Sequence, residues 1–118
     1  MSRVFIVDDE LSVAEVIEEL LTARGVTVTV CTDSESAIST ALAGSFDLIL
    51  LDLKMPGKNG VEVIKEIVAK LPHQRILIIT GHPYDLLADE ALRAGAKGLI
   101  PKPFELGRIL DAIEGADG

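Results

Sequence analysis

The stretch FDLILLDLKMPGKNG, residues 46–60, joins a continuous aliphatic run to a charge and then to a turn. Residues 48–51 are all leucine or isoleucine, the pattern of a strand that is buried on both faces. Asp52 follows at once, and the proline and glycines over residues 56–60 prevent the strand from continuing. The sequence therefore predicts a strand over residues 46–52 that presents an aspartate at its carboxyl end.

Strand-like and helix-like segments alternate along the chain on both sides of this stretch. Short apolar or alternating runs predict strands at residues 3–7, 26–31, 46–52, 75–80 and 97–101. Apolar residues at helical spacing predict helices at residues 11–25, 35–44, 59–72, 84–95 and 105–115. Three of the strands are apolar on both faces, which favours a parallel sheet covered by helices on both sides. The predicted fold class is a doubly wound α/β domain.

Composition limits the classes of protein to consider. The chain has 118 residues, which suits one domain over residues 1–118, and 48% of them are hydrophobic. Its formal net charge is −8, and no basic patch of the kind that binds nucleic acid is visible. The single cysteine, Cys31, reads as a packing residue rather than a reactive thiol. No apolar run approaches the length of a membrane span, and no signal peptide is visible, so we expect a cytoplasmic protein without membrane contact.

Polar residues with complementary chemistry follow four of the predicted strands. Asp8 and Asp9 follow the first strand, Asp52 the third, Thr80 the fourth and Lys102 the fifth. In a doubly wound sheet, ligands collect beyond the carboxyl ends of the strands. Neighbouring carboxylates repel one another, and Mg²⁺ and a lysine ammonium both relieve that repulsion. The set predicts phosphoryl transfer to an aspartate, with a metal, a lysine and a threonine hydroxyl stabilising the transferred group.

Four motifs together resemble the receiver domains of two-component response regulators. They are VFIVDDE, LILLDLKMPGKNG, ILIITG and KGLIPKPF, at residues 4–10, 48–60, 76–81 and 97–104. Each motif alone is weak, but the combination is specific and the likeness covers the whole chain. The resemblance implies a single flavodoxin-like domain with strand order 2-1-3-4-5. It also implies a phosphorylatable signalling switch rather than an enzyme.

The resemblance assigns roles around the metal and the phosphoryl group. It implies that Asp52 is the phosphoacceptor, that Asp9 binds Mg²⁺ or Mn²⁺ directly, and that Asp8 binds it largely through water. The backbone carbonyl of Lys54 would complete the protein ligands. The side chains two positions beyond the phosphoacceptor and the threonine often tune phosphoryl lifetime in relatives. Here these are Lys54 and His82, which we expect to modulate dephosphorylation.

Further roles concern the switch itself. The resemblance implies that Thr80 is the switch hydroxyl, that Lys102 pairs with the phosphoryl group, and that the Lys102–Pro103 peptide bond is cis. Gly81 leaves the approach to the phosphoacceptor open. Relatives usually carry Tyr or Phe three positions before the lysine, where this chain has Leu99. The aromatic swing therefore does not carry over. Either a leucine rotamer change replaces it or the signal leaves by another path.

The resemblance also implies partners. The phosphoryl donor would be a phosphohistidine of a sensor histidine kinase or a histidine phosphotransfer protein. In relatives the donor docks over the first helix and the loop after the fifth strand, which points to Leu11, Ala14, Glu18 and Pro103. The output face would be the fourth helix, fifth strand and last helix, which often forms a homodimer in relatives. An output domain or effector protein would respond to it.

Three alternatives stand beside the switch. A metal-dependent phosphatase with an aspartyl nucleophile would resemble D-x-D-x-T after the first strand, where this chain has DDEL. A nucleotide-binding flavodoxin-like protein would need a phosphate-binding loop after VFIV, and none follows. A pseudo-receiver that is never phosphorylated is disfavoured by the intact set of site residues. Taken singly, Asp8 and Asp9 also read as helix caps and Lys102 as a solvated loop charge.

Overall fold

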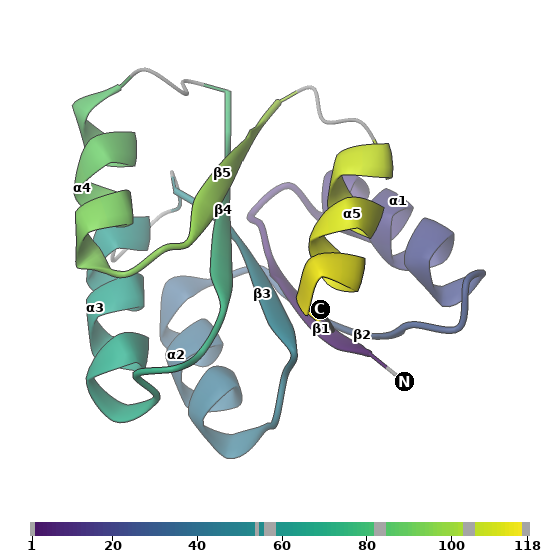
Figure 1. Cartoon of the computed structure of the whole chain (residues 1–118), viewed down its shortest axis with the longest axis horizontal. Coiled ribbons are helices and arrows are strands. Elements are labelled where there is room, and N and C mark those ends of the chain that lie inside the picture. Colours follow the sequence, from purple (N-terminus) through teal and green to yellow (C-terminus); the bar gives the residue numbers. More distant parts are fainter. Residues whose placement is uncertain (1, 54, 56–58, 82–84, 103–105, 117–118) are drawn as a thin grey trace.

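The chain forms a parallel sheet of five strands in the computed structural model, which describes residues 2–53, 55, 59–81, 85–102 and 106–116 (Figure 1). The strands are β1 (Arg3–Val7), β2 (Thr27–Cys31), β3 (Leu48–Asp52), β4 (Ile76–Thr80) and β5 (Gly98–Pro101). Their order is β2-β1-β3-β4-β5, and every neighbouring pair is parallel. The predicted fold class and strand order are confirmed.

Helices cover both faces of this sheet, as continuous apolar strands require. They are α1 (Leu11–Thr22), α2 (Ser34–Ala43), α3 (Gly60–Lys70), α4 (Leu86–Ala94) and α5 (Leu106–Ala116). Figure 1 shows α1 and α5 together on one side of the sheet and α2, α3 and α4 on the other. Within the described ranges, no helix has the length and apolar character needed to cross a membrane.

Two hydrophobic cores form because successive strand residues point to opposite faces. The α2–α4 core contains Phe5, Val7, Ile49, Leu51, Ile76 and Ile78 from the strands, with Ala37, Ala41, Val63, Ile64, Ile67, Ala88 and Ala91 from the helices. The α1–α5 core contains Val4, Ile6, Leu48, Leu50, Leu77, Ile79 and Ile100 from the strands, with Ala14, Ile17, Leu21, Ile109 and Ile113 from the helices. The three central strands are therefore buried on both faces, as predicted.

The start of β3 differs from the predicted boundary. The strand begins at Leu48, two residues after the predicted start, and Phe46 packs half-buried outside the sheet ladder. The Phe46 ring stacks on Phe5, with centroids 4.9 Å apart, and the Arg3 guanidinium lies 5.5 Å from its centroid. An apolar residue in the connecting loop thus made the strand look longer than it is.

Gly60 fixes the turn that carries the chain away from Asp52. Its backbone N–H donates a hydrogen bond of 2.9 Å to the carbonyl of Leu53, the residue after Asp52. A Cβ atom at position 60 would lie 2.8 Å from the Cα of Leu53, closer than real contacts allow. Asn59 then caps α3 by accepting a hydrogen bond from Glu62 N–H. The last glycine of the 46–60 stretch is therefore required by close backbone approach.

Candidate functional site

Three of the polar residues predicted to form the site continue the same face of the sheet. Asp8, Asp52 and Lys102 each stand two positions beyond a residue of the α1–α5 core. Those residues are Ile6, Leu50 and Ile100. Since side chains alternate along a strand, a spacing of two keeps each polar group on the side that faces α1 and α5. The carboxyl ends of β1, β3 and β5 therefore deliver two carboxylates and one ammonium to a common place.

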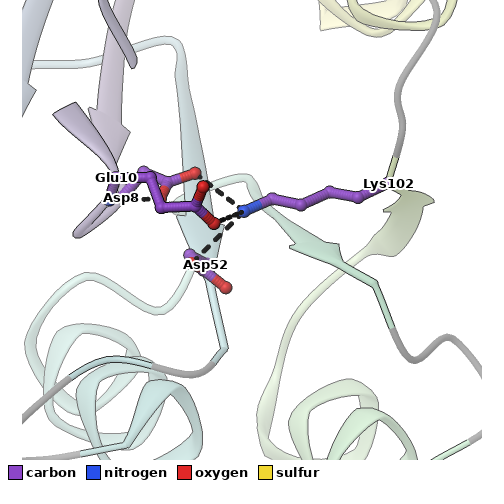
Figure 2. Close-up of polar contacts among 4 residues, drawn as sticks. All are labelled: Asp8, Glu10, Asp52 and Lys102. Atoms are coloured by element: carbon purple, nitrogen blue, oxygen red, sulfur yellow. Dashed lines mark hydrogen bonds and ion pairs between the residues drawn. The ribbon is translucent and has the colours of Figure 1, made fainter. Parts of the chain in front are cut away.

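The ammonium group of Lys102 is the centre of this cluster (Figure 2). Its Nζ lies 3.1 Å from Oδ2 of Asp8, 3.4 Å from Oδ2 of Asp52 and 3.6 Å from Oε1 of Glu10. Asp8 is fully buried, and the side chain of Asp52 is only 9% exposed. Figure 2 shows the extended lysine side chain entering from the β5 side to meet the three acids. One cation thus offsets the repulsion within a largely buried acidic group.

The surroundings of Lys102 keep it charged. Burial by itself lowers the pKa of its ammonium, but the contact with Asp8 and the negative charges of Asp52 and Asp8 act in the opposite direction. Their combined effect raises the pKa of Lys102 above its ordinary value. The group is therefore a permanent positive charge at neutral pH, as stabilisation of a phosphoryl group requires.

The acidic cluster suits a hard divalent cation. One carboxylate oxygen from each of Asp8, Asp9 and Asp52 lies within 4.8 Å of the other two. Oδ1 of Asp8 accepts a hydrogen bond of 2.9 Å from Glu10 N–H, whereas its buried Oδ2 accepts none that is well aligned, although Lys102 is near. A buried carboxylate oxygen without a hydrogen bond is costly, and a metal ion would satisfy it. Oxygen ligands of this kind fit Mg²⁺ or Mn²⁺.

Thr80 and Leu99 lie on the other face of the sheet. Thr80 ends β4 two positions beyond Ile78 of the α2–α4 core and is 2% exposed. Leu99 is half-buried against the same core, and its Cα pairs with that of Ile78. The carbonyl of Thr80 accepts a hydrogen bond of 2.7 Å from Lys102 N–H. The backbone of Thr80 is therefore hydrogen-bonded to the backbone of Lys102, while its side chain lies on the same face of the sheet as Leu99.

Gly81 follows Thr80 and is exposed. A Cβ atom at this position would have no heavy atom within 4 Å. The predicted role of Gly81, to leave the approach to Asp52 open, stays a prediction. Three other predicted residues, Lys54, His82 and Pro103, lie outside the described residues.

One residue in the cluster, Glu10, was not predicted from the sequence. It follows the acidic pair directly, and that adjacency was the only available signal. Its pairing with Lys102 depends on how far the lysine side chain reaches across the sheet, which local sequence does not reveal.

The outward face of α1 corrects one docking prediction. Ala14 is fully buried in the α1–α5 core, so it cannot contact a partner protein and its assignment to the docking surface is wrong. Leu11 and Val16 are each 51% exposed, and Glu18 is half-buried. Leu11 and Val16 are therefore the exposed large apolar side chains of this helix.

Cys31 ends β2 at the edge of the sheet and is half-buried. Its thiol donates a hydrogen bond of 3.2 Å to the carbonyl of Asp33. Burial raises the pKa of the Cys31 thiol, and the negative charge of Asp33 adds to that effect, while backbone hydrogen bonds oppose it. The protonated form is therefore favoured, in agreement with a packing role.

Sequence comparison finds similarity over nearly the whole chain. The sequence model described as response regulator receiver domain matches residues 4–114. The transcriptional regulatory protein FixJ of Bradyrhizobium diazoefficiens is 34% identical over 97% of this chain, which spans 56% of FixJ. The chemotaxis protein CheY of Thermotoga maritima is 31% identical over 94% of this chain and 93% of its own. The chain thus spans about half the length of FixJ and nearly all of CheY.

Comparison with solved structures also finds a response regulator. The response regulator TrrA of Thermotoga maritima, in complex with Mg(2+)-BeF, superimposes with a TM-score of 0.87. It is 29% identical, and the match covers 98% of this chain and 99% of TrrA.

Proposed function

Because this chain belongs to the response regulator receiver domains, the phosphoryl-accepting switches of two-component signalling, we propose that Asp52 accepts the phosphoryl group. The convergence of Asp8, Asp9 and Lys102 on Asp52 is the observation that supports this assignment. We further propose that residues 1–118 form one receiver domain, for which the family match over residues 4–114 is the support.

The proposed transfer begins with a carboxylate oxygen of Asp52, which attacks the phosphorus of a phosphohistidine. A phosphorus–oxygen bond forms, the phosphorus–nitrogen bond breaks, and its electron pair stays on the imidazole of the donor. Lys102 would offset the negative charge on the transferred group, and the Thr80 side chain, which lies on the other face of the sheet, would move toward that group and donate a hydrogen bond from its hydroxyl. Attack by water on the phosphorus of the resulting acyl phosphate later breaks its bond to the Asp52 oxygen, releases inorganic phosphate and restores the carboxylate. The protein thus promotes its own phosphorylation and dephosphorylation.

Receiver domains bind Mg²⁺ at an acidic pocket, and this chain has a cluster of carboxylates at Asp8, Asp9 and Asp52. We assign direct ligation to Asp9 and Asp52, ligation through water to Asp8, and a backbone carbonyl to Lys54. When bound, the cation supplies positive charge for the phosphoryl oxygens. The buried Oδ2 of Asp8, which lacks a well-aligned hydrogen bond, is the structural feature that favours this arrangement.

The partners proposed for this site are those of its family. Receiver domains interact with histidine kinases and output domains. Here the donor, a kinase or a histidine phosphotransfer protein, would dock on α1 at Leu11, Val16 and Glu18, where the exposed apolar side chains lie. The output surface would be α4, β5 and α5, including any homodimer. We place this exchange in the cytoplasm, where receiver domains typically act.

A mass measurement tests the proposed function. The protein is incubated with Mg²⁺ and acetyl phosphate, and its intact mass is followed. Wild type and Asp111→Asn, an exposed control on α5, should each gain one phosphate, whereas Asp52→Asn should gain none. Rapid turnover of a phosphomonoester would favour the phosphatase instead. The absence of any mass gain with wild type would favour a pseudo-receiver.

Two further side chains are proposed to set how long the phosphoryl group lasts. Lys54 and His82 stand two positions beyond Asp52 and Thr80, where relatives tune dephosphorylation. Lys54→Ala and His82→Ala should each change the rate at which the phosphorylated protein loses its phosphate. Unchanged rates in both variants would end this assignment.

A further inference from the structure

The three carboxylates around Lys102 fall into two kinds. Asp8 and Asp52 belong to the group whose oxygens converge within 4.8 Å, together with Asp9. Glu10 is not a member of that group, yet its Oε1 lies 3.6 Å from the same ammonium. The ammonium of Lys102 therefore contacts two candidate metal ligands, Asp8 and Asp52, and also Glu10, which is not a candidate ligand.

This sharing creates a competition. The Nζ of Lys102 approaches the Oδ2 atoms of Asp8 and Asp52, at 3.1 and 3.4 Å, and a divalent cation at the cluster would need oxygens of the same two side chains. Two positive groups held by the same two carboxylates repel each other strongly in a largely buried site. Binding of the cation therefore favours withdrawal of the ammonium from Asp8 and Asp52. A withdrawn ammonium needs another negative partner.

Glu10 is fixed where such a partner is needed. Its backbone N–H donates to Oδ1 of Asp8, and its carbonyl accepts hydrogen bonds from the N–H groups of Val13 and Ala14 at the start of α1. Hydrogen bonds therefore connect the backbone of Glu10 to Asp8 of the acidic cluster on one side and to the start of α1 on the other. Its side chain is 62% exposed, so its carboxylate lies on the solvent side of the lysine.

We propose that Glu10 is a positioning residue that receives the ammonium of Lys102 when a divalent cation occupies the acidic cluster. This role rests on the metal site of the proposed function. In the absence of Glu10, the ammonium remains on Asp8 and Asp52 and opposes the cation. If the Glu10–Lys102 contact were an ordinary exposed ion pair, it would contribute a little to folding stability. Loss of Glu10 would then lower the affinity for Mg²⁺ no more than loss of any other surface carboxylate.

Calorimetric titration with Mg²⁺ alone tests the role of Glu10 without any phosphoryl donor. We expect Glu10→Gln to weaken Mg²⁺ binding by about two- to fivefold, the range of a single exposed ion pair. Glu15→Gln is the matched control, because Glu15 is an exposed acid one turn further along α1 and the variant has the same net charge. It should change the affinity by clearly less. Equal effects of the two variants would overturn the proposal.

A double-mutant cycle then shows whether Glu10 acts through the lysine. In the Lys102→Met background the effect of Glu10→Gln should fall to that of Glu15→Gln. An undiminished effect would mean that Glu10 acts on the cation by its charge alone, and the proposal would be wrong. Unchanged urea midpoints in the glutamate variants exclude a loss of folding as the cause.

The outcomes separate this proposal from the proposed function. If wild type binds Mg²⁺ and Asp52 gains phosphate but the cycle shows no coupling, only the role of Glu10 fails. If the coupling is found but no phosphate is gained, only the phosphoacceptor assignment fails. If wild type does not bind Mg²⁺, both the metal site and the role of Glu10 are overturned.

Discussion

The Nζ of Lys102 lies 3.4 Å from Oδ2 of Asp52, although β4 separates their strands in the sheet. The lysine backbone is held at the end of β4 by the 2.7 Å hydrogen bond from its N–H to the carbonyl of Thr80. From this anchor the side chain reaches over β4 to the ends of β3 and β1 (Figure 2). The positive charge at the site therefore depends on three strands ending at the same level.

Removal of this charge should destabilise the metal-free protein. Lys102→Met leaves the buried carboxylates of Asp8 and Asp52 without their cationic partner, and we expect a loss of about 1–3 kcal/mol in the free energy of unfolding. Mg²⁺ should recover part of the loss, because it can replace the ammonium. Urea unfolding with and without Mg²⁺ measures both effects. Lys97→Met, which removes an exposed lysine, is the control, and equal losses in the two variants would contradict the expectation.

Gly60 should be intolerant of any side chain. In Gly60→Ala the new Cβ would meet the backbone of Leu53, so we expect a loss of about 1–3 kcal/mol from overpacking. The strain falls beside Asp52, so the rate of phosphorylation by acetyl phosphate should fall as well. Gly107→Ala is the control, because a Cβ there meets nothing within 4 Å and alanine favours the helix. A Gly60→Ala variant with wild-type stability and rate would refute this account.

Leu99 should respond to phosphorylation through Thr80. Both side chains lie on the face of the α2–α4 core, and Leu99 is half-buried beside Ile78, two positions before Thr80 on β4. We expect phosphorylation to shift the methyl NMR signals of Leu99, and Thr80→Val, which lacks the hydroxyl, to suppress that shift. The methyl groups of Leu21, buried in the α1–α5 core, serve as an internal reference. A full Leu99 shift in Thr80→Val would point to another path for the signal.

The Cys31 thiol should react slowly in the folded protein. Because burial raises its pKa, less thiolate is present at a given pH than in the unfolded chain. At about pH 8, iodoacetamide should therefore label the native protein more slowly than the urea-unfolded protein. Equal labelling rates of the native and unfolded proteins would show that the surroundings of Cys31 do not suppress formation of its thiolate.

The raised pKa of Cys31 also predicts how the free energy of unfolding changes with pH. A thiol whose pKa is raised on folding stabilises the protein fully at pH values below the unfolded pKa, and this contribution is lost as the pH rises through the folded pKa. The free energy of unfolding should therefore decline in mildly alkaline solution, and Cys31→Ser should reduce the decline. Urea unfolding over a pH series measures the difference between the two proteins.

Most of the fold could be predicted because its signals are local. The aliphatic runs of β1, β3 and β4 and the helical spacing of apolar residues each appear within a few neighbouring residues. The start of β3 could not be predicted, since Phe46 is half-buried against the ring of Phe5 on β1, far away in the chain. The burial of Ala14 depends likewise on how α1 packs on the sheet.

The sequence by itself determined the alternation of strands and helices and the polar residues at the carboxyl ends of four strands, because hydrophobic periodicity and turn residues are properties of adjacent positions. Only the tertiary structure decided which of those polar groups meet. Parity along the strands places Asp8, Asp52 and Lys102 on one face and Thr80 on the other, and strand register brings their ends to one level. The reach of one lysine side chain then adds Glu10 to the site, a contact between residues 92 positions apart that no local pattern encodes.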